Sequence, residues 1–161
     1  MANNYTHFSF AFQINNPAEA EYLETILALP DDIESTGVVE DDGETLERLT
    51  GELLEVFPEW KDYECLGFDY EIECGPDGGE VWIHDDGGEG NVEFVVQFLQ
   101  AYMQKFFIRE PIAFEFALTC SAPRVDEFGG GAVVVTATGA EWFNTRQWIN
   151  KTLDQLAKAV R

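Results

Sequence analysis

The chain contains 161 residues, with 31 Asp and Glu against 9 Lys and Arg, so that its formal net charge is −22 at pH 7. Hydrophobic residues make up 45% and aromatic residues 14%, which is enough to build the core of one domain and excludes a disordered acidic tail. The shortage of Lys and Arg excludes direct binding to nucleic acid, because phosphate contacts need positive charge.

The first predicted element is a strand over residues 5–14. Phe8, Phe10, Phe12 and Ile14 alternate there with smaller or polar side chains, which is the period-two pattern of a half-buried strand.

A helix is predicted next. Asn16 and Pro17 form an N-cap followed by proline at the first helical position. We expect this helix to end near Leu29, because Pro30 begins a polar stretch.

A polar loop is predicted over residues 30–43, followed by a second helix over 44–57 whose leucines recur at helical spacing. Two alternating segments then predict a β-hairpin, with strands at 66–74 and 80–84. We expect the glycine-rich residues 75–79 to form its five-residue loop.

The C-terminal part predicts a helix, two strands and a last helix. Asn91 caps a strongly apolar helix that runs to about Phe107, and the strands follow at 112–120 and 132–138. Asn144 or Thr145 then caps an amphipathic helix, whose apolar residues are Trp148, Ile149, Leu153, Leu156 and Val160.

The predicted order of elements is β-α-α-β-β-α-β-β-α. Without the second helix and the last two elements, this order reduces to β-α-β-β-α-β, the split pattern of ferredoxin-like folds. We therefore expect a single α+β domain over residues 1–161. Its five-stranded, antiparallel-dominated sheet would have helices on one face and leave the other face open.

The location of the protein follows from what the sequence lacks. No run approaches the 18 apolar residues of a membrane-spanning helix, and no basic segment followed by an apolar one begins the chain. Three cysteines, Cys65, Cys74 and Cys120, are too few for a disulfide framework. We therefore expect a cytoplasmic protein.

The negative charge is concentrated in one part of the chain. Residues 19–93 contain 25 acidic and 2 basic residues, whereas the other 86 residues contain 6 acidic and 7 basic ones. A salt-adapted protein would be acidic throughout. Because so much like charge destabilises a folded domain, its concentration suggests a function.

We expect the acidic segment to bind a basic partner, although a solvated face that keeps the protein in solution is the simpler alternative. A compact chain of this length is about 40 Å across, and duplex DNA of that length carries about 24 charges. The acidic segment, with a net charge of −23, is of the same order. The carboxylates in question are Asp31, Asp32, Glu34, Glu40, Asp41, Asp42, Glu44, Glu47, Glu52, Glu55, Asp69, Glu71, Glu73, Asp85 and Asp86.

Two patterns in this set favour a regular array of charge. Asp69, Glu71 and Glu73 share one face of a predicted strand about 6.5–7 Å apart, which is close to the spacing of successive phosphates. Trp82 and His84 are predicted to point outward among these acids, where an aromatic side chain can anchor a partner. The alternative is that a loop or the second helix covers Trp82 and His84. Pairs at helical i,i+3 spacing would be formed by Glu44, Glu47, Glu52 and Glu55.

No metal or cofactor site is predicted. No EF-hand loop fits the sequence, and the histidine and cysteine spacings match no zinc pattern. Acids around the glycine-rich turn at 85–90 would repel a phosphate group. An enzyme centred on Cys120, or on the face of Asp69, Glu71 and Glu73, remains a third interpretation, although alternation places Cys120 on the apolar face.

The segment Thr119–Ala137 (TCSAPRVDEFGGGAVVVTA), with GNVEFVVQFLQAY at 90–102, resembles an uncharacterised family of small acidic proteins found in phage, plasmid and bacterial genomes. The resemblance covers about the C-terminal two thirds of the chain. This family has no known activity, so the resemblance carries over no functional residue. It implies a mobile-element context, in which proteins that counter host defences are expected.

These observations predict a non-enzymatic inhibitor, a DNA mimic of the anti-restriction or anti-CRISPR type. Its acidic surface would occupy the nucleic-acid-binding groove of a basic protein, and it would bind neither nucleic acid nor a membrane. An immunity or antitoxin protein that neutralises a basic nuclease toxin is the alternative. The open face of the sheet also allows a homodimer.

Overall fold

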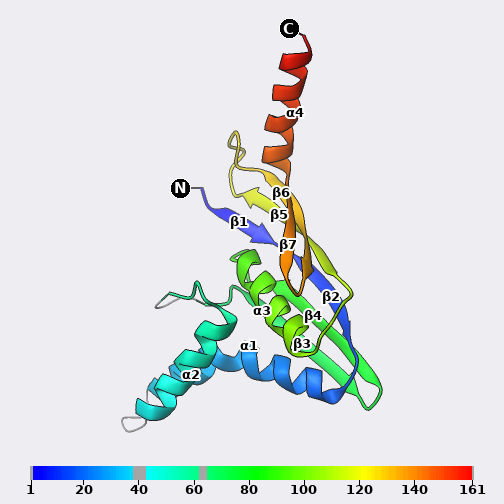
Figure 1. Cartoon of the computed structure of the whole chain (residues 1–161). Coiled ribbons are helices and arrows are strands. Elements are labelled where there is room, and N and C mark those ends of the chain that lie inside the picture. Colours follow the sequence, from blue (N-terminus) through cyan, green and yellow to red (C-terminus); the bar gives the residue numbers. More distant parts are fainter. Residues whose placement is uncertain (1, 38–42, 62–64, 161) are drawn as a thin grey trace.

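A computed structural model of the chain describes residues 2–37, 43–61 and 65–160 (Figure 1). Within these ranges the protein is an α+β fold with four helices and seven strands. In chain order the elements are β1 (Asn4–His7), β2 (Ser9–Ile14), α1 (Pro17–Gly37), α2 (Gly43–Val56), β3 (Phe68–Gly75), β4 (Gly78–Asp85), α3 (Val92–Lys105), β5 (Ile112–Cys120), β6 (Gly129–Thr136), β7 (Gly139–Asn144) and α4 (Thr145–Ala159).

The strands form two antiparallel sheets. Sheet A has the order β1-β5-β6-β7, and sheet B has the order β2-β4-β3. The single five-stranded sheet expected from the sequence is therefore not what the structure contains. The strand predicted at 5–14 divides at Phe8 into β1 and β2, which pair in different sheets, and β7 was not foreseen.

Asp85, the last residue of β4, holds the chain at the point where it passes from sheet A to sheet B. Its Oδ1 accepts from the Phe8 N–H at 2.8 Å, and its own N–H donates to the Phe8 carbonyl oxygen at 2.9 Å. Its Oδ2 accepts from the Gly88 N–H at 2.9 Å and lies 3.1 Å from Nδ1 of His7. Burial opposes ionisation of Asp85, but these hydrogen bonds outweigh it and hold the pKa of its carboxyl below the ordinary value.

The buried residues of both sheets form one core. On sheet B, Val81 and Ile83 point inward, and on sheet A, Val133 and Val135 do so. α1 packs against β3 and α3, and α3 also packs against β6. The helices α1 and α3 thus cover one side, as predicted, and the opposite face of sheet B is open. The prediction was wrong for α4, which extends beyond sheet A and has no buried residue.

A buried carboxylate joins α1 to α3. Glu19 is only 3% exposed, and its Oε2 accepts from the Tyr102 hydroxyl at 2.7 Å and from the Asn15 N–H at 2.9 Å. Burial, followed by the hydrogen bond and charge of Glu19, raises the pKa of Tyr102. Asn16 completes the arrangement, because its Oδ1 accepts from the Glu19 N–H, as an N-cap does.

Helix α1 extends beyond the predicted end at Leu29, so the prediction of a loop from residue 30 was wrong as far as Gly37. Pro30 lies inside the helix, where it removes one backbone hydrogen bond. The helix continues because its next turn places Ile33 against the core. Residues 38–42 of the predicted loop lie outside the described residues.

The hairpin has a shorter loop than predicted. The strands continue through Gly75 and Gly78, which pair with each other, so that only Pro76 and Asp77 connect them instead of residues 75–79. This close approach depends on Gly79, because a Cβ there would overlap the carbonyl oxygen of Glu73.

The remaining helices agree with their predicted ends. Asn91 caps α3, with its side chain accepting from the Phe94 N–H, and Asn144 caps α4 in the same way. Strand β6 begins at Gly129 rather than at 132. No helix of the described chain is both long and apolar enough to span a membrane.

We expect Asp85→Ala to lower the free energy of unfolding by about 3 kcal/mol, because it leaves the Phe8 and Gly88 N–H groups without their acceptor. Denaturant unfolding measures this. The exposed neighbour provides the control Asp86→Asn, which we expect to change stability by no more than about 0.5 kcal/mol. Equal losses in both variants would contradict the assignment.

The same carboxylate predicts a pH dependence. Because the folded-state pKa of Asp85 is lowered, its stabilisation is present above the unfolded-state pKa of about 4 and disappears as the pH falls through the folded value. The stability difference between wild type and Asp85→Asn should therefore be constant above about pH 5 and shrink below pH 4. A difference that grows on acidification would contradict this.

We expect Tyr102→Phe to destabilise the protein by about 2 kcal/mol, because a buried carboxylate loses a hydroxyl donor. Thermal or denaturant unfolding checks this. Tyr22→Phe is the matched control, since the Tyr22 hydroxyl makes no side-chain hydrogen bond with the described residues, and it should leave stability within about 0.5 kcal/mol.

Candidate partner-binding surface

The open face of sheet B carries a row of carboxylates, as the alternation of β3 predicted. Asp69, Glu71 and Glu73 are all exposed and project from one side of the strand. They form no ion pair and no side-chain hydrogen bond within the described residues. Their partners across the sheet on β4 are His84, Trp82 and Glu80, in that order.

Trp82 forms a fixed aromatic contact point on this face. Its side chain is 40% exposed, and its Nε1 donates to Oγ of Ser9 at 2.8 Å. The ring centroids of Trp82 and His84 lie 4.3 Å apart. The outward orientation predicted for both residues is confirmed, and neither is covered by α2, which packs against α1 and α3.

A groove of about 710 Å³ lies beside β3, at the edge of sheet B. Its wall comes from α1, α2, the segment before β3 and β3 itself. The apolar part of the lining consists of Leu27, Pro30, Ile33, Leu53, Trp60, Leu66, Phe68 and Tyr70. The acidic part consists of Asp31, Glu34, Asp69 and Asp86. We call these residues together the acidic groove.

The charges of α1 and β3 converge on Tyr70. Burial raises the pKa of the Tyr70 hydroxyl, and the charges of Asp31, Glu24, Asp32 and Asp69 raise it further. Carboxylates from a helix and from a strand therefore act on the same point from two sides of the acidic groove.

The predicted acids of α2 form a separate group. Glu44, Glu47 and Glu55 are exposed, and Glu52 is half-buried. Oε1 of Glu52 accepts from the Arg48 guanidinium at 2.7 Å, an i,i+4 pair. Tyr22 lies near this group, since burial and then the charge of Glu55 raise its pKa.

Four members of the predicted set are not part of this surface as described. The residues outside the described ranges are Glu40, Asp41 and Asp42. Asp85 is half-buried and its carboxylate is satisfied internally by Phe8, His7 and Gly88, so we assign it to the fold rather than to partner binding. Asp85 is bonded internally because it lies at the end of β4, beside the break between β1 and β2.

The acids do not all lie on one flank. The β3 row faces away from the helices, whereas the acids of α1 and α2 lie on the helical side, and the two groups meet at the acidic groove along the edge strand β3. Figure 1 shows the elements that carry both groups, α1, α2 and β3, at the same end of the molecule. The charge is thus concentrated at one end rather than on one face.

The residues weighed for catalysis or metal binding lie apart from one another. Cys120 is half-buried at the end of β5, opposite Asn4. The two imidazoles are engaged elsewhere, His7 with Asp85 and His84 with Trp82. The described part of the chain contains no group of three or more His, Cys, Asp or Glu side chains able to hold a metal ion.

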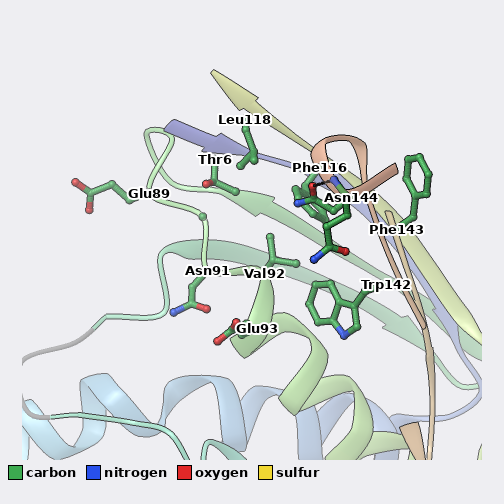
Figure 2. A pocket seen from close by; sticks show the side chains of 12 residues that line it. Thr6, Glu89, Asn91, Val92, Glu93, Phe116, Leu118, Trp142, Phe143 and Asn144 are labelled. Atoms are coloured by element: carbon green, nitrogen blue, oxygen red, sulfur yellow. Dashed lines mark hydrogen bonds between the residues drawn. The ribbon is translucent and has the colours of Figure 1, made fainter. Parts of the chain in front are cut away.

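A second cavity, of about 480 Å³, lies where β7 leads into α4. Figure 2 shows Trp142 of β7 beside Val92 and Glu93 at the start of α3, with Phe116 of β5 nearby. Sequence reasoning missed this cavity because it missed β7, whose adjacent apolar residues Trp142 and Phe143 interrupt the alternation expected of a strand.

The acidic groove was also missed. Its apolar lining combines Leu27 of α1 with Trp60 and Leu66 from a segment that has no regular periodicity. No pattern in the sequence brings these residues together.

No protein-family model, no curated protein and no solved structure matches this chain. The geometry of the acidic groove and of the β3 row is therefore what indicates a function.

Neutralising the β3 row should stabilise the protein. Glu73 lies directly opposite Glu80, and like charges paired across strands repel. We expect the triple variant Asp69→Asn, Glu71→Gln, Glu73→Gln to gain about 1 kcal/mol at low ionic strength and less at high salt. Thermal unfolding at two salt concentrations measures the gain. The charge-matched control is Glu110→Gln, Glu115→Gln, Glu141→Gln, and an equal gain there would contradict a local origin.

Proposed function

We propose that this protein is a non-enzymatic inhibitor that imitates the charge of a nucleic-acid backbone and occupies the binding groove of a basic protein. The observation that carries the proposal is the convergence of carboxylates from α1 and β3 around Tyr70, on the two sides of the acidic groove. The groove has carboxylates from α1 and β3 in its walls, and the β3 row continues this negative charge onto the open face, where a protein that grips DNA could contact it in place of phosphates.

The proposed mechanism is competition. Asp69, Glu71 and Glu73 are held on a strand about 6.5–7 Å apart, so they can meet Lys and Arg side chains that otherwise contact phosphates. Because they form no ion pair with any residue that the structure describes, no such contact has to be broken first. Trp82 adds an aromatic anchor at the centre of the open face.

The wider context is part of the same proposal. The segments at 90–102 and Thr119–Ala137 resemble a family found in phages and plasmids. If the chain belongs to that family, its target would be a host defence or DNA-processing protein, such as a restriction enzyme or a CRISPR effector complex. We place the competition in the cytoplasm, in line with three free cysteines.

We further propose that the two sheets are an elaborated ferredoxin-like fold. If β1 and β2 count as one strand bent at Phe8, the pairing order β5-β1/β2-β4-β3 is that of the split β-α-β arrangement. Strands β6 and β7 and the helices α2 and α4 are then additions to it.

An immunity protein for a basic nuclease toxin is the second candidate. The observation that favours it is the apolar lining of the acidic groove, which includes Trp60, Leu66 and Tyr70. A single cognate partner could insert a matching apolar side chain into that lining. The affinity of this complex would then fall less as salt rises than the affinity of a complex held by charge alone.

The test is a competition experiment. The chain is titrated against a panel of DNA-binding proteins loaded with labelled duplex DNA, including a nucleoid protein, a restriction endonuclease and a CRISPR effector complex. We expect it to displace DNA from at least one of them, less effectively as salt rises, with affinity reduced at least ~10-fold in the Asp69→Asn, Glu71→Gln, Glu73→Gln variant.

The charge-matched variant Glu110→Gln, Glu115→Gln, Glu141→Gln should displace DNA as well as wild type does. Binding that DNA does not affect, or that persists undiminished at high salt, would contradict mimicry and favour the immunity protein. Equal losses in both triple variants would mean that net charge alone is responsible.

A further inference from the structure

Helix α4 has an apolar stripe that the rest of the chain does not cover. Figure 1 shows α4 extending beyond sheet A, at the end of the molecule opposite α1 and α2. None of its residues is buried. The exposed apolar side chains, with fractions between 45% and 89%, are Trp148, Ile149, Leu153, Leu156 and Val160.

The body of the protein holds α4 by its first turn. Asn144 caps the helix, Arg146 forms an ion pair with Asp126, and Oγ1 of Thr145 accepts from the Gly130 N–H at 3.1 Å. An isolated helix of 15 residues is marginally stable in water. The roughly three turns beyond this attachment therefore need a packing partner.

The stripe has the spacing of a coiled-coil seam. Ile149, Leu153, Leu156 and Val160 follow one another at intervals of four, three and four residues, as the a and d positions of a heptad do. The positions that flank such a seam are small or uncharged: Asn150, Thr152, Ala157 and Ala159. Another helix can therefore approach closely without meeting charge, and Lys151 and Lys158 fall on the far side.

We propose that α4 is a dimerisation helix that pairs antiparallel with α4 of a second copy of this chain. The interval order four, three, four is the same read in either direction. An antiparallel partner therefore places its own seam residues against this seam, with Ile149 opposite Val160 of the partner subunit and Leu153 opposite Leu156 of the partner subunit.

Charge selects the antiparallel arrangement over the parallel one. Each chain carries −22, concentrated at the end formed by α1, α2 and sheet B, whereas α4 carries Arg146, Lys151 and Lys158 against Asp154. Parallel pairing would place the two bodies side by side. Antiparallel pairing places them at opposite ends of the helix pair and brings the copies together through their least negative parts.

The area is sufficient for a reversible dimer. Burying the four seam side chains on both copies, at roughly 100 Å² each, removes about 800 Å² from water, and contact at the four flanking positions brings the total to about 1,000 Å². That is the lower range for a specific interface, so we expect a dissociation constant in the micromolar range.

The oligomeric state of the purified full chain tests this first. Sedimentation equilibrium should give a concentration-dependent rise from 18.1 kDa to twice that mass. Leu153→Glu with Leu156→Glu should weaken association at least ~100-fold, while the control Lys151→Glu, which changes the charge by the same amount on the far side of the helix, should leave it within ~3-fold.

Because α4 buries no side chain in the body, the near-ultraviolet dichroism of the core should be unchanged in all three proteins. A wild type that stays monomeric, or a dimer that the Leu153 and Leu156 substitutions leave intact, would overturn the proposal. If those substitutions disturb the core signal, the milder Ile149→Ala with Leu156→Ala must show the same weakening, and its failure to do so overturns the proposal as well.

Cross-linking tests the direction of pairing. In a chain with Cys65, Cys74 and Cys120 replaced by serine, Ile149→Cys with Val160→Cys should form disulfide-linked dimers, because these two positions are about 16 Å apart within one helix and cannot bridge internally. Val160→Cys alone should remain uncross-linked. Efficient cross-linking of that single variant would mean parallel pairing and would overturn the antiparallel dimer.

Discussion

The architecture depends on a single carboxylate at the point where the chain changes sheets. Phe8 is the residue at which one extended segment stops pairing with β5 and starts pairing with β4. The Asp85 carboxylate accepts a hydrogen bond from the Phe8 N–H, and the Asp85 N–H donates to the Phe8 carbonyl oxygen. Both backbone groups of Phe8, which the change of strand partner would leave unpaired, are therefore satisfied. Its other oxygen fixes Gly88, whose backbone, at φ +86°, passes against Tyr5 and His7 too closely to carry a side chain. This arrangement closes the junction between the two sheets, whose buried residues share one core.

Local sequence signals predicted most of the secondary structure, whereas tertiary contacts between distant residues decided the rest. Asn91 and Asn144 identified the starts of α3 and α4 because a cap acts within one turn of chain. The break at Phe8 left no trace in the sequence, since the alternation of apolar residues continues unchanged through it. Pro30 gave the wrong end for α1 because packing of the following turn outweighed the lost hydrogen bond. The single sheet expected from the sequence became two for the same reason: strand pairing is settled by tertiary contacts.

The candidate surface was predictable where it follows the pleat of one strand. Asp69 and Trp82 point outward because side chains alternate across a sheet, and no further information is needed for that. The acidic groove was not predictable, because Leu27 of α1 and Trp60, which follows α2, come together only in the tertiary structure, where α1 packs against α2 and β3. Asp85, by contrast, was predicted to belong to the surface and does not. Its charge marked it as one more surface acid, and only the position of the sheet junction reveals that it is half-buried and internally bonded.

The separation of charge between the two ends of the molecule has a consequence for how it moves before any contact is made. With 25 acids and 2 bases in residues 19–93 and near balance elsewhere, and with those residues forming α1, α2 and most of sheet B (Figure 1), the protein has a large permanent electric dipole along its long axis. In the field of a positively charged surface such a body experiences a torque as well as an attraction. It therefore turns its α1–α2 end toward that surface while still several ångströms away, and its approach is oriented before it arrives.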